Sequence, residues 1–446
     1  MKELPLYSAI KAYAGKDPAR FHMPGHKGKL SPFDVTEVAG TDNLHSPHEA
    51  ILESERLCAA AMGAEDAFFL VSGSTAGNLA MLMLLGCGKR VLLGRNCHKS
   101  VINGLAVAGH EAVPLIPDED GIVTAEKVDE ALSAAHCDAV FITSPTYRGA
   151  VSPIAEIAEA AHSHGALLFV DCAHGAHFAF SGKLPDIPAE ADAWCVSCHK
   201  TLDAYTQTAL LLTGASCPFS RERVQNTLNM FQSTSPSYPL MMSIEASVLA
   251  HADWDEHADR IMRVREKLAS ISGVRLIDAA APYQDLTRLN IGVSGIRGRE
   301  LEAKLIEAGI YAEMADSECV TLITTPSDKD EWYEKLISAI EALPRENDLH
   351  DNSGHSINKE IRPGERKVTV REAVTGDTEK VPIAESVGRI CAGAAGCYPP
   401  GTAILFPGEI ITRANADLLL SEAEDGAELF GAENGMATVL KEAGSV

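Results

Sequence analysis

The sequence predicts an α/β fold in which a mostly parallel sheet is covered by helices. From Glu49 to about residue 215, short apolar runs alternate with amphipathic segments, which is the order expected of a parallel sheet with helical crossovers. Gly86 and Gly165 stand where helix C-caps are expected. The chain has 446 residues, which is enough for about three structural units. We therefore expect one large α/β domain followed by smaller ones.

Seven short apolar runs are expected to form the large sheet. They span residues 67–71, 90–93, 112–116, 139–143, 166–170, 193–196 and 209–213. Between them, residues 76–85, 125–135 and 154–164 carry the apolar periodicity of helices. This pattern predicts a seven-stranded sheet that is mostly parallel.

The residue pattern in the second half of the chain predicts a smaller α/β domain followed by a C-terminal unit. A long amphipathic stretch after Ser237 predicts one or two helices up to about residue 272. Strands are then expected at 274–277, 289–293, 311–314, 320–324 and 403–406, and helices at 299–308 and 328–343. The predicted units are an N-terminal arm (1–48), a large domain (49–240), a small α/β domain (241–343), a polar linker (344–365) and an α+β C-terminal domain (366–446).

The charge of the chain argues against nucleic acid and membranes as partners. The sequence has 38 basic and 62 acidic residues and a formal net charge of −24, so it repels phosphate backbones and anionic headgroups. No apolar run approaches the roughly 20 residues of a membrane span, and the first residues lack the pattern of a secretory signal. We expect a cytoplasmic protein that binds neither partner.

The cysteines are expected to be reduced thiols. There are 11 of them, an odd number without a dense framework. Cys195, Cys198 and His199 match the C-x-x-C-H pattern of haem attachment, and the two cysteines equally fit half of a zinc site. Haem attachment requires export, and no second ligand pair has the right spacing for zinc. We therefore predict no metal site.

Four motifs at the ends of predicted strands carry candidate chemistry. In SGSTAGN, the hydroxyls of Ser74 and Thr75 lie at a helix N-terminus, where they form either an anion site or a plain helix cap. Asp171 ends a buried strand in VDCAHGAHF and needs a partner there. A protonated pyridinium nitrogen would serve, but so would a helix N-terminus or a basic side chain.

The other two motifs offer a nucleophile and an aromatic ring. Lys200 in SCHKT lies among apolar neighbours, so desolvation can lower its pKa and make its amine nucleophilic, although most lysines are solvated surface residues. Ser197 and His199 flank this lysine and are suited to hold a phosphate or relay a proton. His98 in NCHKS is suited to stack on a flat cofactor, unless it is an ordinary surface histidine.

Taken in order, these motifs resemble those of the fold type I pyridoxal phosphate enzymes, and specifically the short form of the bacterial Orn/Lys/Arg decarboxylase family. The resemblance spans nearly the whole chain. It rests on RFHMPGHKG (20–28), GTDNLHSP (40–47), SGSTAGN (72–78), NCHKS (96–100), SPTYRG (144–149), VDCAHGAHF (170–178), SCHKT (197–201), STSPSYPLM (233–241) and YPPGTAILFPGE (398–409).

The resemblance implies a role for each matching residue. Lys200 would form the Schiff base with pyridoxal 5'-phosphate, Asp171 would hold the pyridinium proton and His98 would stack on the ring. The remaining cofactor contacts would come from Ser74, Thr75, Ala173, His174, Ser197 and His199. The chain departs from the family at Cys172, where Glu is common, and at Cys198, which is more often Thr.

The resemblance also implies the reaction, which is decarboxylation of a basic amino acid with the proton returned to Cα by Lys200 or His199. L-Arginine, giving agmatine and CO2 as in polyamine metabolism, is the expected substrate, with lysine or ornithine as alternatives. An aminotransferase or lyase on the same fold, or a catalytically silent regulatory homologue, are further alternatives. A homodimer or larger homo-oligomer with shared active sites is expected. Asp42 is one candidate for binding the distal cation of the substrate.

Overall fold

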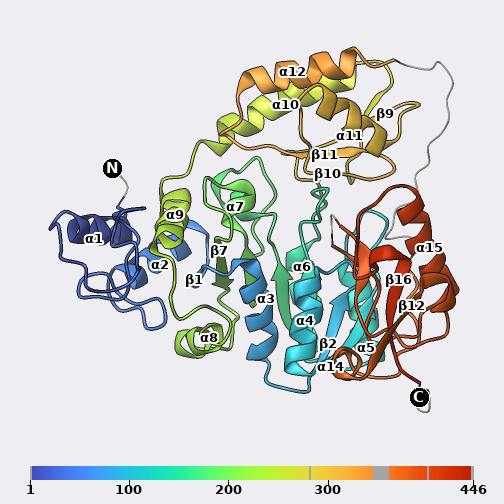
Figure 1. The fold of residues 1–446 in the computed structure, drawn as a ribbon, viewed down its shortest axis with the longest axis horizontal. Coiled ribbons are helices and arrows are strands. Elements are labelled where there is room, and N and C mark those ends of the chain that lie inside the picture. The colour runs from blue at the N-terminus through green and yellow to red at the C-terminus, as the bar shows by residue number, and fades with distance from the viewer. Residues whose placement is uncertain (1–2, 281–282, 345–360, 399–400, 443–446) are drawn as a thin grey trace.

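The large domain lies at the centre of the molecule, with the small domain and the C-terminal domain on two sides of it (Figure 1). The computed structural model describes residues 3–280, 283–344, 361–398 and 401–442. None of the helices in these ranges has the length and apolar character that a membrane span requires. Most of the predicted linker lies outside the described residues.

The large domain contains the predicted sheet of seven strands, in the order β1-β7-β6-β5-β4-β2-β3. The strands are β1 (Asp66–Leu70), β2 (Arg90–Gly94), β3 (Glu111–Leu115), β4 (Ala139–Thr143), β5 (Leu167–Asp171), β6 (Ala193–Val196) and β7 (Ala209–Thr213). Strands β2 to β6 are parallel, and β7 runs antiparallel to both β1 and β6. The predicted fold class is confirmed.

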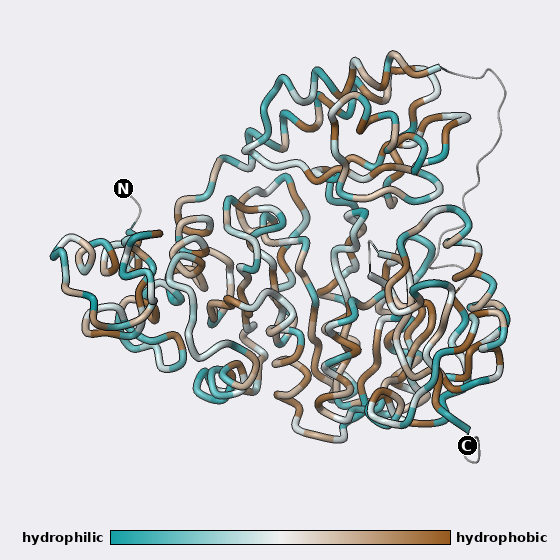
Figure 2. The backbone as a smooth tube through the Cα atoms, in the orientation of Figure 1, coloured by the Kyte–Doolittle hydropathy of each residue, from teal (hydrophilic) through white to brown (hydrophobic). Residues whose placement is uncertain are grey.

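Both faces of this sheet are apolar, and helices cover both. The hydrophobic colour of many residues in this central region can be followed along the backbone in Figure 2. One face packs against α1 (Pro5–Ala14), α2 (Ala50–Ala61), α5 (Ala125–Ala134), α6 (Ile154–Ser163) and α9 (Tyr238–Leu249). The other packs against α3 (Gly73–Leu84), α4 (Lys99–Ala108), α8 (Arg221–Leu228) and residues of the C-terminal domain. Gly86 and Gly165 follow α3 and α6 with φ of 88° and 73°, the left-handed conformation that glycine favours after a helix.

The N-terminal helix α1 is anchored on the large domain. Leu6 and Ile10 are fully buried, and the N–H groups of Leu6 and Tyr7 donate to the two carboxylate oxygens of Glu245 on α9, at 2.7 and 2.8 Å. A division of the chain at residue 240 would cut through α9, whose buried residues belong to the large-domain core.

The small domain has a four-stranded sheet in the order β10-β11-β9-β8, in which every pairing is antiparallel. Its elements are α10 (Trp254–Ser270), β8 (Val274–Leu276), β9 (Arg288–Val293), α11 (Gly298–Glu307), β10 (Met314–Ala315), β11 (Val320–Ile323) and α12 (Asp330–Glu341). The strand expected at 311–314 begins only at Met314, since Met314 and Ala315 are the residues that pair with β11, while Tyr311 is 79% exposed.

The C-terminal domain is α+β and packs against the α3 and α4 side of the large sheet. Its elements are α14 (Val370–Thr375), β12 (Thr378–Pro382), β13 (Ala395–Cys397), β14 (Ala403–Leu405), α15 (Arg413–Glu424), β15 (Leu429–Phe430) and β16 (Met436–Leu440). Its Val370, Ala403 and Phe406 are buried in the same core as α3 and α4. This packing brings the domain to the carboxyl ends of the parallel strands.

Candidate active site

A cavity of about 180 Å³ lies at the carboxyl ends of the parallel strands, which is where open α/β sheets bind ligands. All three domains contribute to its wall. Six of the predicted site residues line it: Ser74, His98, Asp171, Ala173, His174 and Lys200. Thr75, Ser197 and His199 do not. The small domain adds Met314 and Asp316, and the C-terminal domain adds Thr402 and Glu422.

Asp171 is the last residue of β5, and its carboxylate is held by an asparagine. The Asn78 amide on α3 donates to Oδ2 of Asp171 at 2.8 Å, and the N–H of Ala173 donates to Oδ1 at 3.2 Å. Asn78 is itself fixed, since it donates to the Ser100 hydroxyl and accepts from the Cys195 thiol, both at 2.9 Å. In the described part of the chain, this buried carboxylate accepts hydrogen bonds from neutral groups only.

Lys200 reaches the cavity from α7 (Cys198–Thr201), the short helix that follows β6. Its Nζ lies 2.8 Å from Nε2 of His174 and 5.3 Å from the ring centroid of Tyr147. Burial lowers the pKa of Lys200, and Asp171 opposes this by favouring the charged form. The amine therefore loses its proton more readily than a surface lysine does.

His98 is fixed at the N-terminus of α4. Its Nδ1 accepts the N–H of Ser100 at 3.2 Å and lies 2.8 Å from the Ser100 hydroxyl. Its backbone forms an isolated β-bridge with Thr402 of the C-terminal domain. Burial lowers the pKa of His98, so the ring in the cavity is mainly neutral.

The predicted phosphate residues occupy different positions. Ser74 lies in the first turn of α3, where backbone N–H groups lack intrahelical acceptors. The Ser197 hydroxyl donates to that of Ser74 at 3.0 Å from behind, while Thr75 is exposed. Nδ1 of His199 lies 2.8 Å from the Thr208 carbonyl oxygen, and its ring is not part of the cavity wall.

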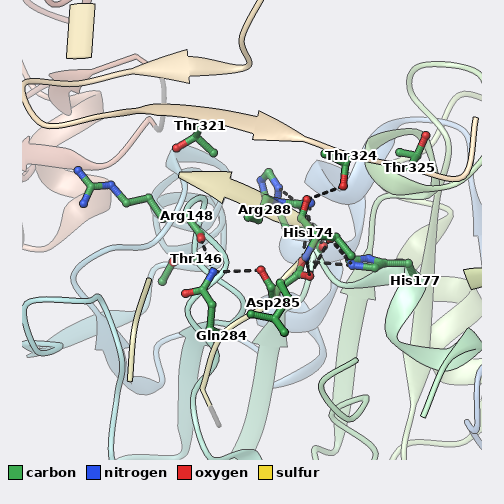
Figure 3. A network of polar contacts seen from close by, with 12 residues as sticks. Thr146, Arg148, His174, His177, Gln284, Asp285, Arg288, Thr321, Thr324 and Thr325 are labelled. Atoms are coloured by element: carbon green, nitrogen blue, oxygen red, sulfur yellow. Dashed lines mark hydrogen bonds and ion pairs between the residues drawn. The ribbon is translucent and has the colours of Figure 1, made fainter. Parts of the chain in front are cut away.

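Three further residues at the site carried no role in the sequence interpretation. Asn78 and Tyr147 lie inside the motifs SGSTAGN and SPTYRG. Membership of these motifs is the sequence signal that could have identified them as site residues. The Tyr147 ring lies 4.3 Å from that of His174, and its hydroxyl donates to Glu313 at 3.2 Å. Arg288, on β9, donates to the His174 carbonyl oxygen at 3.2 Å and lies outside every motif (Figure 3).

Asp42 does not lie at this cavity, so its suggested role in substrate binding is wrong within this chain. Its side chain is buried and accepts the backbone N–H groups of Asn43, His48, Glu49 and Ile51. It therefore organises the turn that leads into α2. Its φ of 62° shows that the turn needs a residue that tolerates the left-handed region.

The residues of the cavity fit pyridoxal phosphate. The buried Asp171 carboxylate makes no charged contact among the described residues and faces the cavity, which suits a pyridinium N–H. An amine of lowered pKa, a neutral imidazole and a hydroxyl at a helix N-terminus line the same wall. Fold and site together define the fold type I class of pyridoxal phosphate enzymes.

The comparisons with known proteins identify the family. Residues 4–288 match the Orn/Lys/Arg decarboxylase major domain, and residues 358–440 match the C-terminal domain of the same family. The chain belongs to the Orn/Lys/Arg decarboxylase family, whose members are pyridoxal-phosphate-dependent decarboxylases of basic amino acids.

Similar proteins span the whole chain. Arginine decarboxylase of Bacillus subtilis is 31% identical over 99% of this chain and 98% of the relative, and that of Halalkalibacterium halodurans is 31% identical over 99% and 97%. Among solved structures, the constitutive lysine decarboxylase of E. coli has a TM-score of 0.80 at 20% identity, covering 98% of this chain and 82% of that one. This structural likeness establishes the fold.

Proposed function

We propose that this chain binds pyridoxal 5'-phosphate and decarboxylates L-arginine to agmatine and CO2. The observation that carries the proposal is that Lys200, Asp171 and His98 line one cavity that is also lined by several other acidic residues. The full-length relatives named arginine decarboxylase support the choice of substrate.

The proposal gives each residue a task. The cofactor, when bound, supplies an electron sink for the electrons that departing CO2 leaves at Cα. The Lys200 amine would hold the cofactor covalently, the Asp171 carboxylate would hold the proton of its pyridine nitrogen, and the neutral His98 ring would lie against it. Ser74 and the first turn of α3 would bind its phosphate, and the Ser197 hydroxyl, which donates to that of Ser74, would hold Ser74 in place.

The return of a proton to Cα is better assigned to Lys200 than to His199. Lys200 lines the cavity, and its pKa is lowered, so its ammonium gives up a proton readily. The His199 ring lies outside the cavity wall beside the Thr208 carbonyl. We therefore propose Lys200 as the proton donor, with His199 as a support that ties α7 to the backbone of Thr208.

The acidic wall supports a basic substrate. Besides Asp171, the cavity is lined by Glu119, Asp120, Asp278, Asp316 and Glu422. Asp316 is paired with Arg148, whose Nε donates to it at 3.1 Å, and Glu422 is paired with Arg299 at 3.2 Å. These two carboxylates are already neutralised by protein cations.

Asp120 is the acid that we propose as acceptor of the substrate guanidinium. Burial and the neighbouring Asp118 raise the pKa of Asp120, and Arg148 only partly offsets this. A cation placed beside Asp120 would stabilise its charged form, so a substrate guanidinium and this carboxylate favour each other. Asp120→Asn should raise KM for arginine far more than it lowers kcat.

The test is a comparison of three substrates. The purified protein with pyridoxal phosphate is offered arginine, lysine and ornithine, and the amine product and kcat/KM are measured for each. We expect agmatine to form with the highest kcat/KM. A preference for lysine or ornithine would overturn the choice of substrate. A keto acid product would indicate an aminotransferase, and no turnover with any of the three would favour the silent homologue.

We also propose a homodimer whose active sites are shared, in a reducing compartment such as the cytoplasm. In the N-terminal arm, Phe21 is 98% exposed, Leu30 84% and Met23 52%. Apolar side chains grouped in one short segment are suited to burial against a second copy of the chain. The described cysteines are free thiols, which fits a reducing compartment.

A further inference from the structure

A chain of polar contacts runs from the small domain to Lys200. Nε2 of His174 lies 2.8 Å from Nζ of Lys200, and Nδ1 of the same ring lies 3.4 Å from Nη2 of Arg288. The same Nη2 donates to the His174 carbonyl oxygen at 3.2 Å. Figure 3 shows Arg288 against His174, with Asp285 and His177 beside them. Both His174 and Arg288 are buried.

The inventory of donors and acceptors decides where the His174 ring carries its proton. A guanidinium has donors only, so the ring nitrogen that faces Arg288 must offer a lone pair. Burial lowers the pKa of His174 well below its ordinary value, and the charges of Lys200 and Arg288 add to this, so the ring is neutral and has one N–H. That proton is on Nε2, and Nε2–H faces the amine of Lys200.

An amine that accepts a hydrogen bond must have a lone pair. A protonated lysine has three donors and no acceptor, so it cannot receive the Nε2–H of His174. We propose that Arg288 is a positioning residue that holds His174 in its Nε2–H tautomer and thereby keeps the free amine of Lys200 uncharged and nucleophilic. The value of this to catalysis rests on the proposed function, in which that amine bonds to the cofactor.

Arg288 is itself held in place by an acid of the small domain. Asp285 Oδ2 lies 3.7 Å from Nη1 of Arg288 and 3.2 Å from Nε2 of His177. The N–H and hydroxyl of Thr287 donate to Oδ1 of Asp285 at 2.9 and 2.7 Å. Asp285 and Arg288 are fully buried, so the guanidinium has no route to solvent.

Other charged and titratable groups act on the Lys200 amine from the surrounding elements. Asp171 on β5, Glu313 before β10 and the Cys195 thiol on β6 favour the ammonium form, and Arg288 on β9 opposes it. The ring of His98 and the hydroxyl of Tyr147 complete the wall. Arg288 can therefore lower the pKa of Lys200 in two ways, directly through its charge or indirectly through His174, and the two must be separated.

A double-mutant cycle makes that separation. The pKa of Lys200 is measured in the cofactor-free full chain from the pH dependence of its modification by trinitrobenzenesulfonate, with the Lys200 peptide quantified by mass spectrometry. The variants are Arg288→Met, His174→Phe and the double variant. Arg389→Met, which removes an arginine paired with Glu379 in the C-terminal domain, is the matched control.

We expect Arg288→Met to raise the pKa of Lys200 by about one pH unit when His174 is present, and by much less when it is Phe. Arg389→Met should leave the pKa of Lys200 unchanged. If Arg288→Met raised this pKa equally with His174 and with Phe at position 174, the effect would be direct charge repulsion and the proposal would be overturned. No increase in either case would also overturn it.

A second measurement needs no change at Arg288 and so does not depend on the variant folding. Nitrogen-15 NMR of the histidine rings, with the His174 signals identified by their loss in His174→Phe, reports which ring nitrogen is protonated. We expect protonation at Nε2, and protonation at Nδ1 would overturn the proposal. Neither readout involves turnover, so failure of the proposed substrate would leave both results interpretable.

Discussion

The free amine of Lys200 is the group on which the proposed chemistry depends most directly. Lys200→Ala removes this amine and a contact with the already neutral His174, so the fold should persist. Borohydride reduction of wild type in the presence of pyridoxal phosphate should add the reduced cofactor's mass to the peptide containing Lys200, and the variant should gain none. A variant that kept both normal turnover and a reducible bond would refute the assignment.

Asp171→Asn tests the carboxylate at the end of β5. The substitution keeps the shape of the side chain but removes its negative charge, so cofactor uptake should continue while kcat falls on the order of 10²- to 10³-fold, as for loss of one preorganised electrostatic partner. Cofactor absorbance gives the first quantity and agmatine release the second. Near-normal kcat would mean that Asp171 serves only to hold α3 through Asn78.

Asp285 should make stability depend on pH in acid. Burial alone would raise the pKa of this carboxyl, but His177, Arg288 and Thr287 lower it below its ordinary value. A depressed folded pKa stabilises the fold above the unfolded pKa of about 3.9, and the contribution is lost as pH falls through the folded value.

Asp285→Asn should therefore reduce the free energy of unfolding by about 3–5 kcal/mol at neutral pH, since it leaves Arg288 buried without its anion. The difference in the free energy of unfolding between Asp285→Asn and wild type should become smaller below about pH 4. Urea unfolding at several pH values measures both quantities, and a difference that stayed constant with pH would contradict this reading.

At the level of single residues, part of the site could be predicted from the sequence and part could not. Lys200, Asp171 and His98 follow predicted strands, and strand ends meet at one edge of a parallel sheet, so their convergence on one cavity follows from the sequence. The support given by Asn78 to Asp171 depends on the approach of α3 to β5, which no local pattern encodes. Arg288 reaches His174 only because a second domain packs there.

The helix α3 lies so close to β6 that one of its positions must be glycine. A Cβ on Gly77 would lie 2.9 Å from the Cβ of Cys195 and 3.1 Å from Leu70. Gly77→Ala should therefore destabilise the protein by about 1–3 kcal/mol through overpacking, despite the better helix propensity of alanine.

Gly182→Ala is the matched control, because nothing lies within 4 Å of a Cβ at that position. It should leave the midpoint of thermal unfolding nearly unchanged, while Gly77→Ala lowers it. Because the next residue is Asn78, the shift of α3 should also weaken the hold on Asp171 and reduce kcat. Equal midpoints for Gly77→Ala and wild type would show that α3 can move away without cost.

The elements themselves were predictable wherever the residue pattern is local. Strands β4, β6 and β7 have the expected boundaries, because each contains at least four consecutive buried apolar residues, followed by a threonine in β4 and β7. Helix α4 was not expected, although its buried residues recur at helical spacing. The antiparallel direction of β7 is set by its pairing with β1 and β6, which only the assembled sheet determines.

The protein is expected to be active as a homodimer. Phe21→Ser together with Leu30→Ser replaces two exposed apolar side chains of the N-terminal arm and should shift light scattering from dimer toward monomer, with loss of activity. Trp332→Ser, at a side chain that is 53% exposed on the small-domain helix α12, is the control and should leave the dimer intact. A fully active wild-type monomer would rule out shared sites.

The division into three domains has a consequence for synthesis. The cavity wall contains Cys397, Thr402 and Glu422, which leave the ribosome after more than three hundred preceding residues, including Lys200 and Asp171. Domains fold in order as they emerge. The early part of the chain can therefore complete its sheet before the C-terminal part of the cavity wall exists, and the cavity is complete only once Cys397, Thr402 and Glu422 have folded against it.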